Sequence, residues 1–239
     1  MKKIIALFLI CIITFFIYQY SRPGLNLVSI GDTLAVGTNA YQNTKFGYSD
    51  FVKSYLEENN QLSSYNKSFA KSNYHSPDLL RDLKNNKTKK IDGRNVSLQN
   101  LIHDSDILLI SIGVNELFSK LNIEETGSKD HLYEHIDQIM NDIDDLYEEI
   151  SKYARNQVIV IGFYNPKTSQ RNNELTPVIN YANKELKKIA KHHNFDFIDI
   201  YHLFKNNPNF LSSPDNIYPG SEGYRAIAKL IITQIKRNN

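Results

Sequence analysis

The sequence predicts a three-layer α/β/α domain built around a mostly parallel central sheet. Three observations support this fold class. Short apolar runs of strand length are each followed by a polar or glycine-containing loop. Amphipathic stretches with helical spacing separate these runs, and such alternation is typical of a parallel sheet covered on both faces. With 239 residues and 41% hydrophobic content, the chain can bury the core of one such domain.

The predicted strands are short and apolar. The first covers residues 25–30 and ends at a glycine. The run ILLISI at residues 107–112 stops at Gly113, and the run at 158–161 stops at a glycine as well. A last strand is predicted at residues 195–200. Apolar runs of this length are typical of strands buried on both faces of a parallel sheet.

The predicted helices lie between these strands and after the last one. Residues 136–150 place isoleucine, methionine, leucine and tyrosine at spacings of three and four, which makes one apolar helical face. The acidic side chains of that segment are expected on the solvated face. The other helices are predicted at residues 50–58, 98–102, 178–192 and 223–235.

The first residues predict a membrane anchor. Two lysines precede a nearly unbroken apolar stretch, and no small-residue cleavage site follows it. We expect a signal anchor at residues 1–21 that contacts the membrane through residues 4–20, a short linker at 22–24 and one domain at 25–239. The leading lysines orient a single-pass protein with its domain on the extracytoplasmic side; cleavage of the segment would make the protein secreted. Cys11 lacks the preceding small residue of a lipoprotein signal, and the domain contains no other cysteine for a disulfide.

The overall charge favours no nucleic-acid partner. The formal net charge is +2 and the pI is about 8.4, so no large field of one sign is expected. The basic tract around Lys87, Lys89 and Lys90 is interpreted as a solvated loop.

Four short motifs follow the predicted strands in a set order. They are GDTL at residues 31–34, GVNE at 113–116, GFYNP at 162–166 and DNIYP at 215–219. Ligand sites of parallel sheets lie outside the carboxyl ends of the strands, where Thr33, Asn115 and Asn165 are expected. In order and spacing the motifs resemble the SGNH (GDSL) hydrolase family, in particular its lipases and acylhydrolases from Gram-positive bacteria. The resemblance covers residues 25–236 and implies the flavodoxin-like three-layer fold of that family.

The resemblance also implies a catalytic site, and this chain departs from it. In the family a serine attacks an acyl carbon, a histidine takes its proton and an aspartate orients the histidine. By resemblance these positions are Thr33, Tyr218 and Asp215. The oxyanion-hole positions are Asn115 and Asn73, of which Asn73 stands where a glycine amide is expected. The aspartate and Asn115 are thus retained, whereas the nucleophile, the base and the glycine are replaced.

The replacements weaken the chemistry. The extra methyl group of Thr33 restricts its side-chain torsion and crowds the line of attack. A phenol such as Tyr218 titrates near 10 in model peptides, so it cannot accept a proton at neutral pH as an imidazole can. A side chain at Asn73 is expected to hinder a tetrahedral intermediate.

Other residues offer alternative roles. His75 lies in the loop expected to border the site and is the candidate surrogate base, with a surface position as the alternative. Glu116 is interpreted as a loop cap and His202 as structural. His131 and His135 are spaced as metal ligands can be, but no third ligand is apparent, so no metal or other cofactor is predicted.

Aromatic residues suggest a binding pocket. Tyr41, Phe46 and Tyr48 follow Thr33 in the chain, and Tyr164 and Tyr218 belong to later motifs. They would suit a sugar ring or an acyl chain. The alternative is that they only cover the sheet.

Three functional hypotheses follow. The first is an impaired hydrolase-like protein that binds a cell-envelope glycan, lipid or protein partner. The second is an active esterase, lipase or acylhydrolase that uses Thr33 with His75 or a water-mediated base. The third is a structural envelope protein.

Overall fold

The computed structural model describes residues 24–38, 46–123, 129–166, 172–211 and 217–238. Five parallel strands form the central sheet in the order β2-β1-β5-β6-β7. The register joins Val28 to Leu108 and Leu108 to Val158, so the three inner strands are aligned side by side. Their bounds are Leu25–Gly31 (β1), Leu62–Asn66 (β2), Ile107–Ser111 (β5), Gln157–Ile161 (β6) and Asp196–Ile198 (β7).

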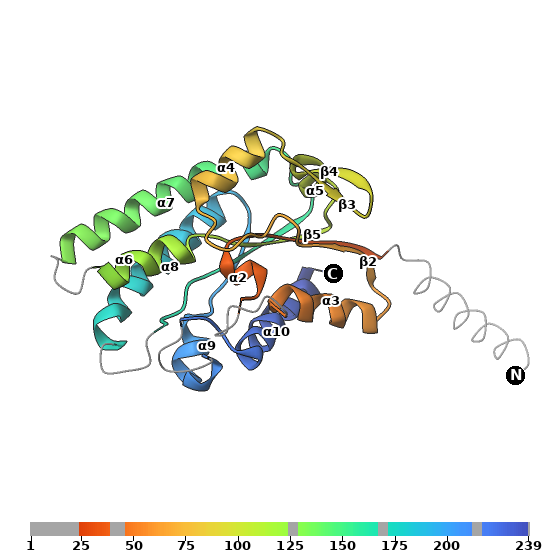
Figure 1. The fold of residues 1–239 in the computed structure, drawn as a ribbon. Coiled ribbons are helices and arrows are strands. Elements are labelled where there is room, and N and C mark those ends of the chain that lie inside the picture. Colours follow the sequence, from red (N-terminus) through yellow and green to blue (C-terminus); the bar gives the residue numbers. More distant parts are fainter. Residues whose placement is uncertain (1–23, 39–45, 124–128, 167–171, 212–216, 239) are drawn as a thin grey trace, which may run out of the picture.

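Helices cover both faces of the sheet, as Figure 1 shows. Helices α3 (Tyr48–Glu58) and α10 (Ser221–Asn238) pack against each other on one face. On the other face, α7 (Lys129–Ser151) packs between α4 (Ser76–Lys84) and α8 (Asn172–His192). The predicted three-layer α/β/α fold with a parallel sheet is therefore confirmed.

Shorter elements complete the described chain. A two-stranded antiparallel hairpin, β3 (Thr88–Ile91) and β4 (Arg94–Ser97), connects α4 to α5 (Leu98–His103). The remaining elements are α2 (Thr33–Val36), α6 (Val114–Ile123), α9 (Tyr201–Asn206) and the 3₁₀ turn η1 (Pro208–Phe210).

The core of the described residues runs from the first strand to the last helix. The buried apolar side chains of these residues lie between Leu27 and Ile235, with β5 fully buried along its length. A chain that starts at Arg22 retains every one of these side chains. We expect that fragment to fold on its own.

Most predicted elements are present, and the differences have physical reasons. The strands at 25–30, 107–112 and 158–161 and all five predicted helices are found within a few residues of their expected bounds, although α7 and α8 begin earlier. The strand predicted at 195–200 is shorter, because only 196–198 pair with β6. The sequence reading missed β2, whose letters LSSYN carry little apolar signal because the strand lies at the sheet edge.

Glycines permit two close backbone contacts near the end of β1. Gly31 has a φ of 126°, and a Cβ added there would lie 1.8 Å from the Ser111 carbonyl oxygen. Gly37 and Gly47 cross so closely that a Cβ on Gly37 would lie 2.4 Å from the Gly47 nitrogen. The C-cap of α2 at Gly37 therefore lies directly against the N-cap of α3 at Gly47.

Some predictions concern residues outside the described ranges. The expected anchor at residues 4–20 and Cys11 are among them. Among the residues that the structure does describe, no helix has the length and apolar character needed to cross a bilayer.

Candidate functional site

Thr33 lies where the structure brings three chain segments together. It is the first residue of α2, directly after β1, and is only 2% exposed. Asn115 lies in the first turn of α6, directly after β5. The loop before α4 supplies the third segment through Asn73 and Tyr74. These segments meet at the carboxyl ends of β1 and β5, where the sequence places the site.

The Thr33 hydroxyl bonds to Asn115 and Asn73, and to Tyr218 as described below. It donates to Asn115 Oδ1 at 2.9 Å and accepts from the backbone N–H of Asn73 at 3.0 Å. Asn115 Nδ2 in turn donates to the Tyr74 carbonyl oxygen at 3.4 Å. The Asn115 amide therefore presents its oxygen, not its N–H, to the hydroxyl. The hydroxyl proton points to an amide oxygen, which is no general base.

Asn73, which the resemblance places at an oxyanion-hole position, has a backbone conformation that glycine also adopts. Its φ is 55°, in the left-handed region that glycine and asparagine adopt most readily. The side chain is exposed, and the N–H is directed at Thr33. The asparagine thus reproduces the backbone conformation available to a glycine, while its N–H is already occupied by the hydroxyl.

Tyr218 lies next to Thr33 and is half-buried. Burial raises the pKa of its phenol above the ordinary value of 10, and a side-chain hydrogen bond with Thr33 offsets only part of this rise. The phenol is therefore fully protonated at neutral pH. Its neighbour Ile217 is held by a hydrogen bond from the Tyr164 hydroxyl to the Ile217 carbonyl oxygen.

Asp32 joins the two strand ends beneath the site. One carboxylate oxygen accepts from Leu34 N at 3.1 Å and from Ser111 Oγ at 3.2 Å, and the other accepts from Val114 N at 2.9 Å. Burial and then the nearby charge of Glu116 raise the pKa of Asp32 to about 7. Because its oxygens face these donors, Asp32 orders the loops that carry Thr33 and Asn115. The sequence analysis assigns Asp32 no role of its own. Its position in the GDTL motif, next to Thr33, is the only sequence feature that could have pointed to this role.

Helix α4 starts directly after His75, and Glu116 of α6 bonds to its first residue. The backbone of His75 precedes the helix, its side chain is exposed, and no described histidine hydrogen-bonds to the Thr33 hydroxyl. Glu116 Oε1 accepts from Ser76 N at 2.7 Å and from Ser76 Oγ at 2.9 Å. Glu116 thus caps α4, the role that the sequence favoured for it.

The other candidates differ in burial, or lie outside the described residues. Asp215 lies in residues 212–216 and Tyr41 lies in residues 39–45, which are both outside the described ranges. Tyr48 and Tyr164 are fully buried in the core, whereas Phe46 is 54% exposed. Asn165 follows β6 and is 7% exposed.

No metal centre is formed by the described side chains. They contain no group of three or more His, Cys, Asp or Glu residues arranged to hold an ion. His131 lies beside Glu134 at 3.4 Å instead.

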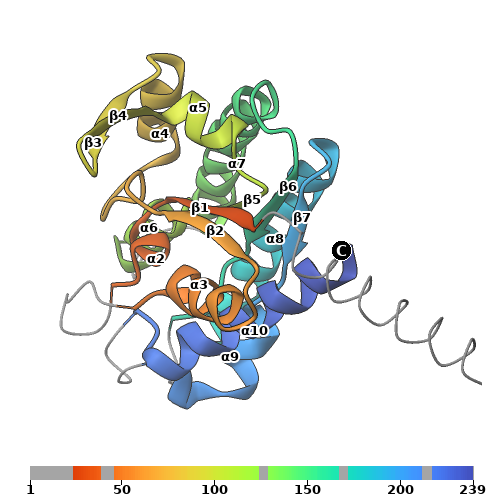
Figure 2. The same cartoon turned by 90° about the vertical axis from the view of Figure 1, so that its right-hand side faces the viewer.

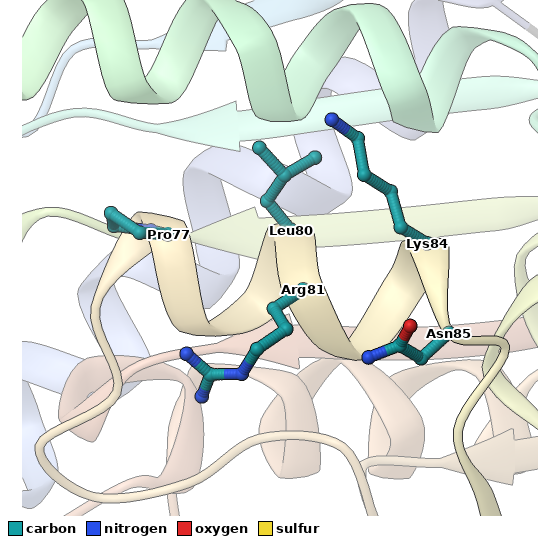
Figure 3. A pocket seen from close by; sticks show the side chains of 5 residues that line it. All are labelled: Pro77, Leu80, Arg81, Lys84 and Asn85. Carbon is teal, nitrogen blue, oxygen red and sulfur yellow. The ribbon is translucent and has the colours of Figure 1, made fainter.

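A hollow of about 310 Å³ lies on α4, away from these residues. Pro77, Leu80, Arg81, Lys84 and Asn85 line it, and Figure 3 shows them along one helix. None of the candidate catalytic residues contributes to this hollow.

Comparison with known proteins assigns the family. The model of the GDSL-like lipase/acylhydrolase family matches residues 29–226. The chain belongs to this family. Among curated relatives of this GDSL-like chain, the Bacillus subtilis protein YpmR, itself uncharacterized, is 27% identical over 91% of this chain and 84% of its own length. The spore germination lipase LipC of Bacillus licheniformis is 26% identical over 86% of this chain and 93% of its own length.

Solved structures share the GDSL fold. A lipase from a goat rumen metagenome, Lip_vut3, superposes with a TM-score of 0.73 at 24% identity, covering 87% of this chain and 96% of that one. The acetylxylan esterase Axe2 of Geobacillus stearothermophilus gives a TM-score of 0.65 at 17% identity, covering 89% and 94%. In one catalytic mutant of Axe2 a serine is replaced by alanine, and in another a histidine is replaced by alanine.

Proposed function

We propose that this GDSL family member is impaired in ester hydrolysis and binds a cell-envelope ligand at the retained site. One observation carries the first part: the Thr33 hydroxyl donates its hydrogen bond to the Asn115 amide oxygen and not to a base. Tyr218, which stands at the position of the base by resemblance, has a pKa raised by burial and so holds its proton. Loss of one triad member removes about four orders of magnitude of rate in serine hydrolases.

The oxyanion-hole donors support the same conclusion. A hole stabilises negative charge only through N–H groups that are free to point at it. Here the Asn73 N–H is bonded to the Thr33 hydroxyl, and the Asn115 Nδ2 is bonded to a carbonyl oxygen. Hydrolysis would need both donors to be released and an external base to be supplied.

Aryl ester hydrolysis by the fragment 22–239 tests the impairment. We expect the native fragment and Thr33→Ala to give equal rates on short-chain and long-chain esters, because the hydroxyl is not activated. The double variant Thr33→Ser/Tyr218→His should exceed both by about tenfold or more, since it restores a nucleophile and a base. A fluorophosphonate probe should label the double variant alone.

The controls separate the two changes. Thr33→Ser alone tests whether the extra methyl group is the obstacle, and Tyr218→Phe removes only the phenol hydroxyl. Native turnover that disappears in Thr33→Ala would contradict the proposal and favour the alternative, an active esterase or acylhydrolase with Thr33 as nucleophile. In that case His75→Ala would show whether this exposed imidazole acts as the base.

The ligand class is proposed from the relatives and from the site. LipC is named as a lipase and Axe2 as an acetylxylan esterase, so an acyl chain or an acetylated glycan is the candidate ligand. Half-buried Tyr218 and exposed Phe46 offer aromatic surface for either. Thermal shifts with acetylated xylo-oligosaccharides and with short-chain phospholipids would separate the two classes. A shift that persists in Tyr218→Ala would place binding elsewhere.

Anchoring is part of the proposal. The apolar stretch at residues 4–20 supports a single-pass position with the domain outside the cell membrane. Fractionation of cells should find the full chain in membranes and a chain lacking residues 1–21 in the soluble fraction. A full chain recovered as a shortened, secreted form would show that the segment is cleaved.

A further inference from the structure

Positive charge is concentrated in one part of the domain. Residues 67–97 contain eight Lys and Arg against three Asp, whereas the rest of residues 25–239 contains seventeen Lys and Arg against twenty-three Asp and Glu. The small net charge of the chain therefore hides a basic segment on an acidic domain. This segment includes α4 and the hairpin of β3 and β4.

Five exposed cations of this segment follow one another along α4 and the hairpin. We call them the basic strip: Arg81, Lys84, Lys87, Lys90 and Arg94. Arg81 pairs with Asp78 at 2.6 Å, and Lys87 pairs with Asp82 at 2.7 Å. The other three members form no ion pair with any described residue.

The hairpin separates its inward and outward lysines. Lys89 is partly buried, its ammonium donates to the Ser68 carbonyl oxygen, and it lies over the Phe69 ring. Lys90 is the next residue along β3 and projects from the opposite face, where it is exposed. Lys89 thus fixes the hairpin to the domain while Lys90 is left for a partner.

The strip runs toward the end of the sheet at which β1 begins. Helix α4 starts beside the candidate site, where Glu116 caps Ser76, and then runs back along the sheet. Figure 2 shows the hairpin, α5 and the start of β1 on the side facing the viewer. In Figure 3, Lys84 points to the same side of α4 as Leu80, whereas Arg81 points to the opposite side; all three line the hollow.

The expected linker keeps this end of the domain close to a bilayer. Residues 22–24 separate the predicted anchor from Leu25, and three extended residues span about 10 Å. That distance is about one Debye length at physiological ionic strength. Cations at this end would therefore interact with the charge of the membrane surface.

We propose that the basic strip binds anionic lipid head groups of the membrane that holds the anchor. This inference rests on the anchoring proposed above. Charge complementarity supports it, because each Lys or Arg near an anionic surface adds to the attraction. The contact can be weak by itself, since an anchored domain meets the surface at high effective concentration.

Vesicle sedimentation with the fragment 22–239 tests the contact without the anchor. We expect binding to vesicles that contain one third phosphatidylglycerol, weak or no binding to pure phosphatidylcholine, and loss of binding as salt rises. The variant Lys84→Gln/Lys90→Gln/Arg94→Gln should reduce the partition coefficient by about tenfold to a hundredfold. None of these residues belongs to the candidate catalytic site.

A matched variant controls for net charge. Lys184→Gln/Lys205→Gln/Lys229→Gln removes three exposed lysines from α8, α9 and α10 and should bind like the native fragment. Equal losses in both variants, or no preference for anionic vesicles, would overturn the inference. Because the fragment has no anchor and the assay needs no hydrolysis, neither result depends on the proposed function of the site.

Discussion

At the scale of single residues, a hydroxyl, an amide and a carbonyl determine what the candidate site can do. Thr33 donates to Asn115, and Asn115 donates to Tyr74. The Thr33 proton is therefore directed at the Asn115 amide oxygen, and an Asn115 amide proton is directed at a backbone carbonyl oxygen. The positions that the resemblance assigns to the nucleophile and to an oxyanion-hole donor are thus bonded to each other.

Asp32 gives the stability of the domain a predicted pH dependence. Burial raises the pKa of Asp32 to about 7 in the folded chain, against 3.8 for an ordinary aspartate. The folded state therefore holds a proton that the unfolded state releases, and stability should fall as pH rises from about 4 to 7 and level off above. The shift corresponds to about 4 kcal/mol as an upper bound. Urea denaturation at several pH values measures it.

The variant Asp32→Asn isolates the contribution of that residue. It should be less stable at low pH, because an amide accepts fewer of the three hydrogen bonds, and its stability should change less between pH 5 and 7. An unchanged slope in the variant would assign the pH dependence to other groups.

The sequence could predict some of these residues and not others. Thr33 and Asn115 each follow an apolar run, and parallel strands bring such positions to one edge of the sheet. The roles of Tyr74 and of Ser76 could not be predicted, because their partners lie about 40 residues away in the chain and their bonds use backbone atoms or a single hydroxyl. No local pattern encodes such contacts.

At the scale of elements, the end of β1 depends on the absence of a side chain at Gly31. We expect Gly31→Ala to destabilise the domain by about 3 kcal/mol or more, since the added Cβ would lie 1.8 Å from the Ser111 carbonyl oxygen of β5. Gly93→Ala is the control. Gly93 also has a positive φ, of 80°, but nothing lies within 4 Å of an added Cβ, so its cost should be only about 1 kcal/mol. Similar midpoints of thermal unfolding for the two variants would contradict the steric explanation.

The start of α4 depends on Glu116 in α6. Glu116→Ala should cost about 1–3 kcal/mol, because Ser76 N and Ser76 Oγ lose their acceptor in a partly buried place. Glu116→Gln keeps an oxygen for these donors and should cost less. It also removes the charge that raises the pKa of Asp32, so the pH range of the stability change should shift downward. Denaturant titration of both variants measures these changes. Equal losses in the free energy of unfolding would contradict the role of Glu116 as an acceptor for Ser76.

The elements that the sequence predicted are those with strong apolar patterns. The run at 107–112 is buried on both faces and has the clearest signal. The hairpin at 88–97 consists mostly of polar and charged residues, with few apolar ones. Such a composition favours the prediction of a solvated loop. Its strands pair only with each other, and pairing between polar segments leaves little trace in composition.

At the scale of the whole molecule, the domain should be independent of its first 21 residues. The described core lies entirely between Leu27 and Ile235. The fragment 22–239 and the full chain in detergent should therefore unfold at the same temperature, within a few degrees, by circular dichroism. A fragment that melts far lower would show that the N-terminal segment contributes to the core.

The crossing of Gly37 and Gly47 has a practical consequence for engineering. Since these two backbones are in contact, the spacing between α2 and α3 does not depend on what joins them. A peptide tag inserted into residues 39–45 should therefore leave folding intact, and the midpoint of thermal unfolding would show whether it does.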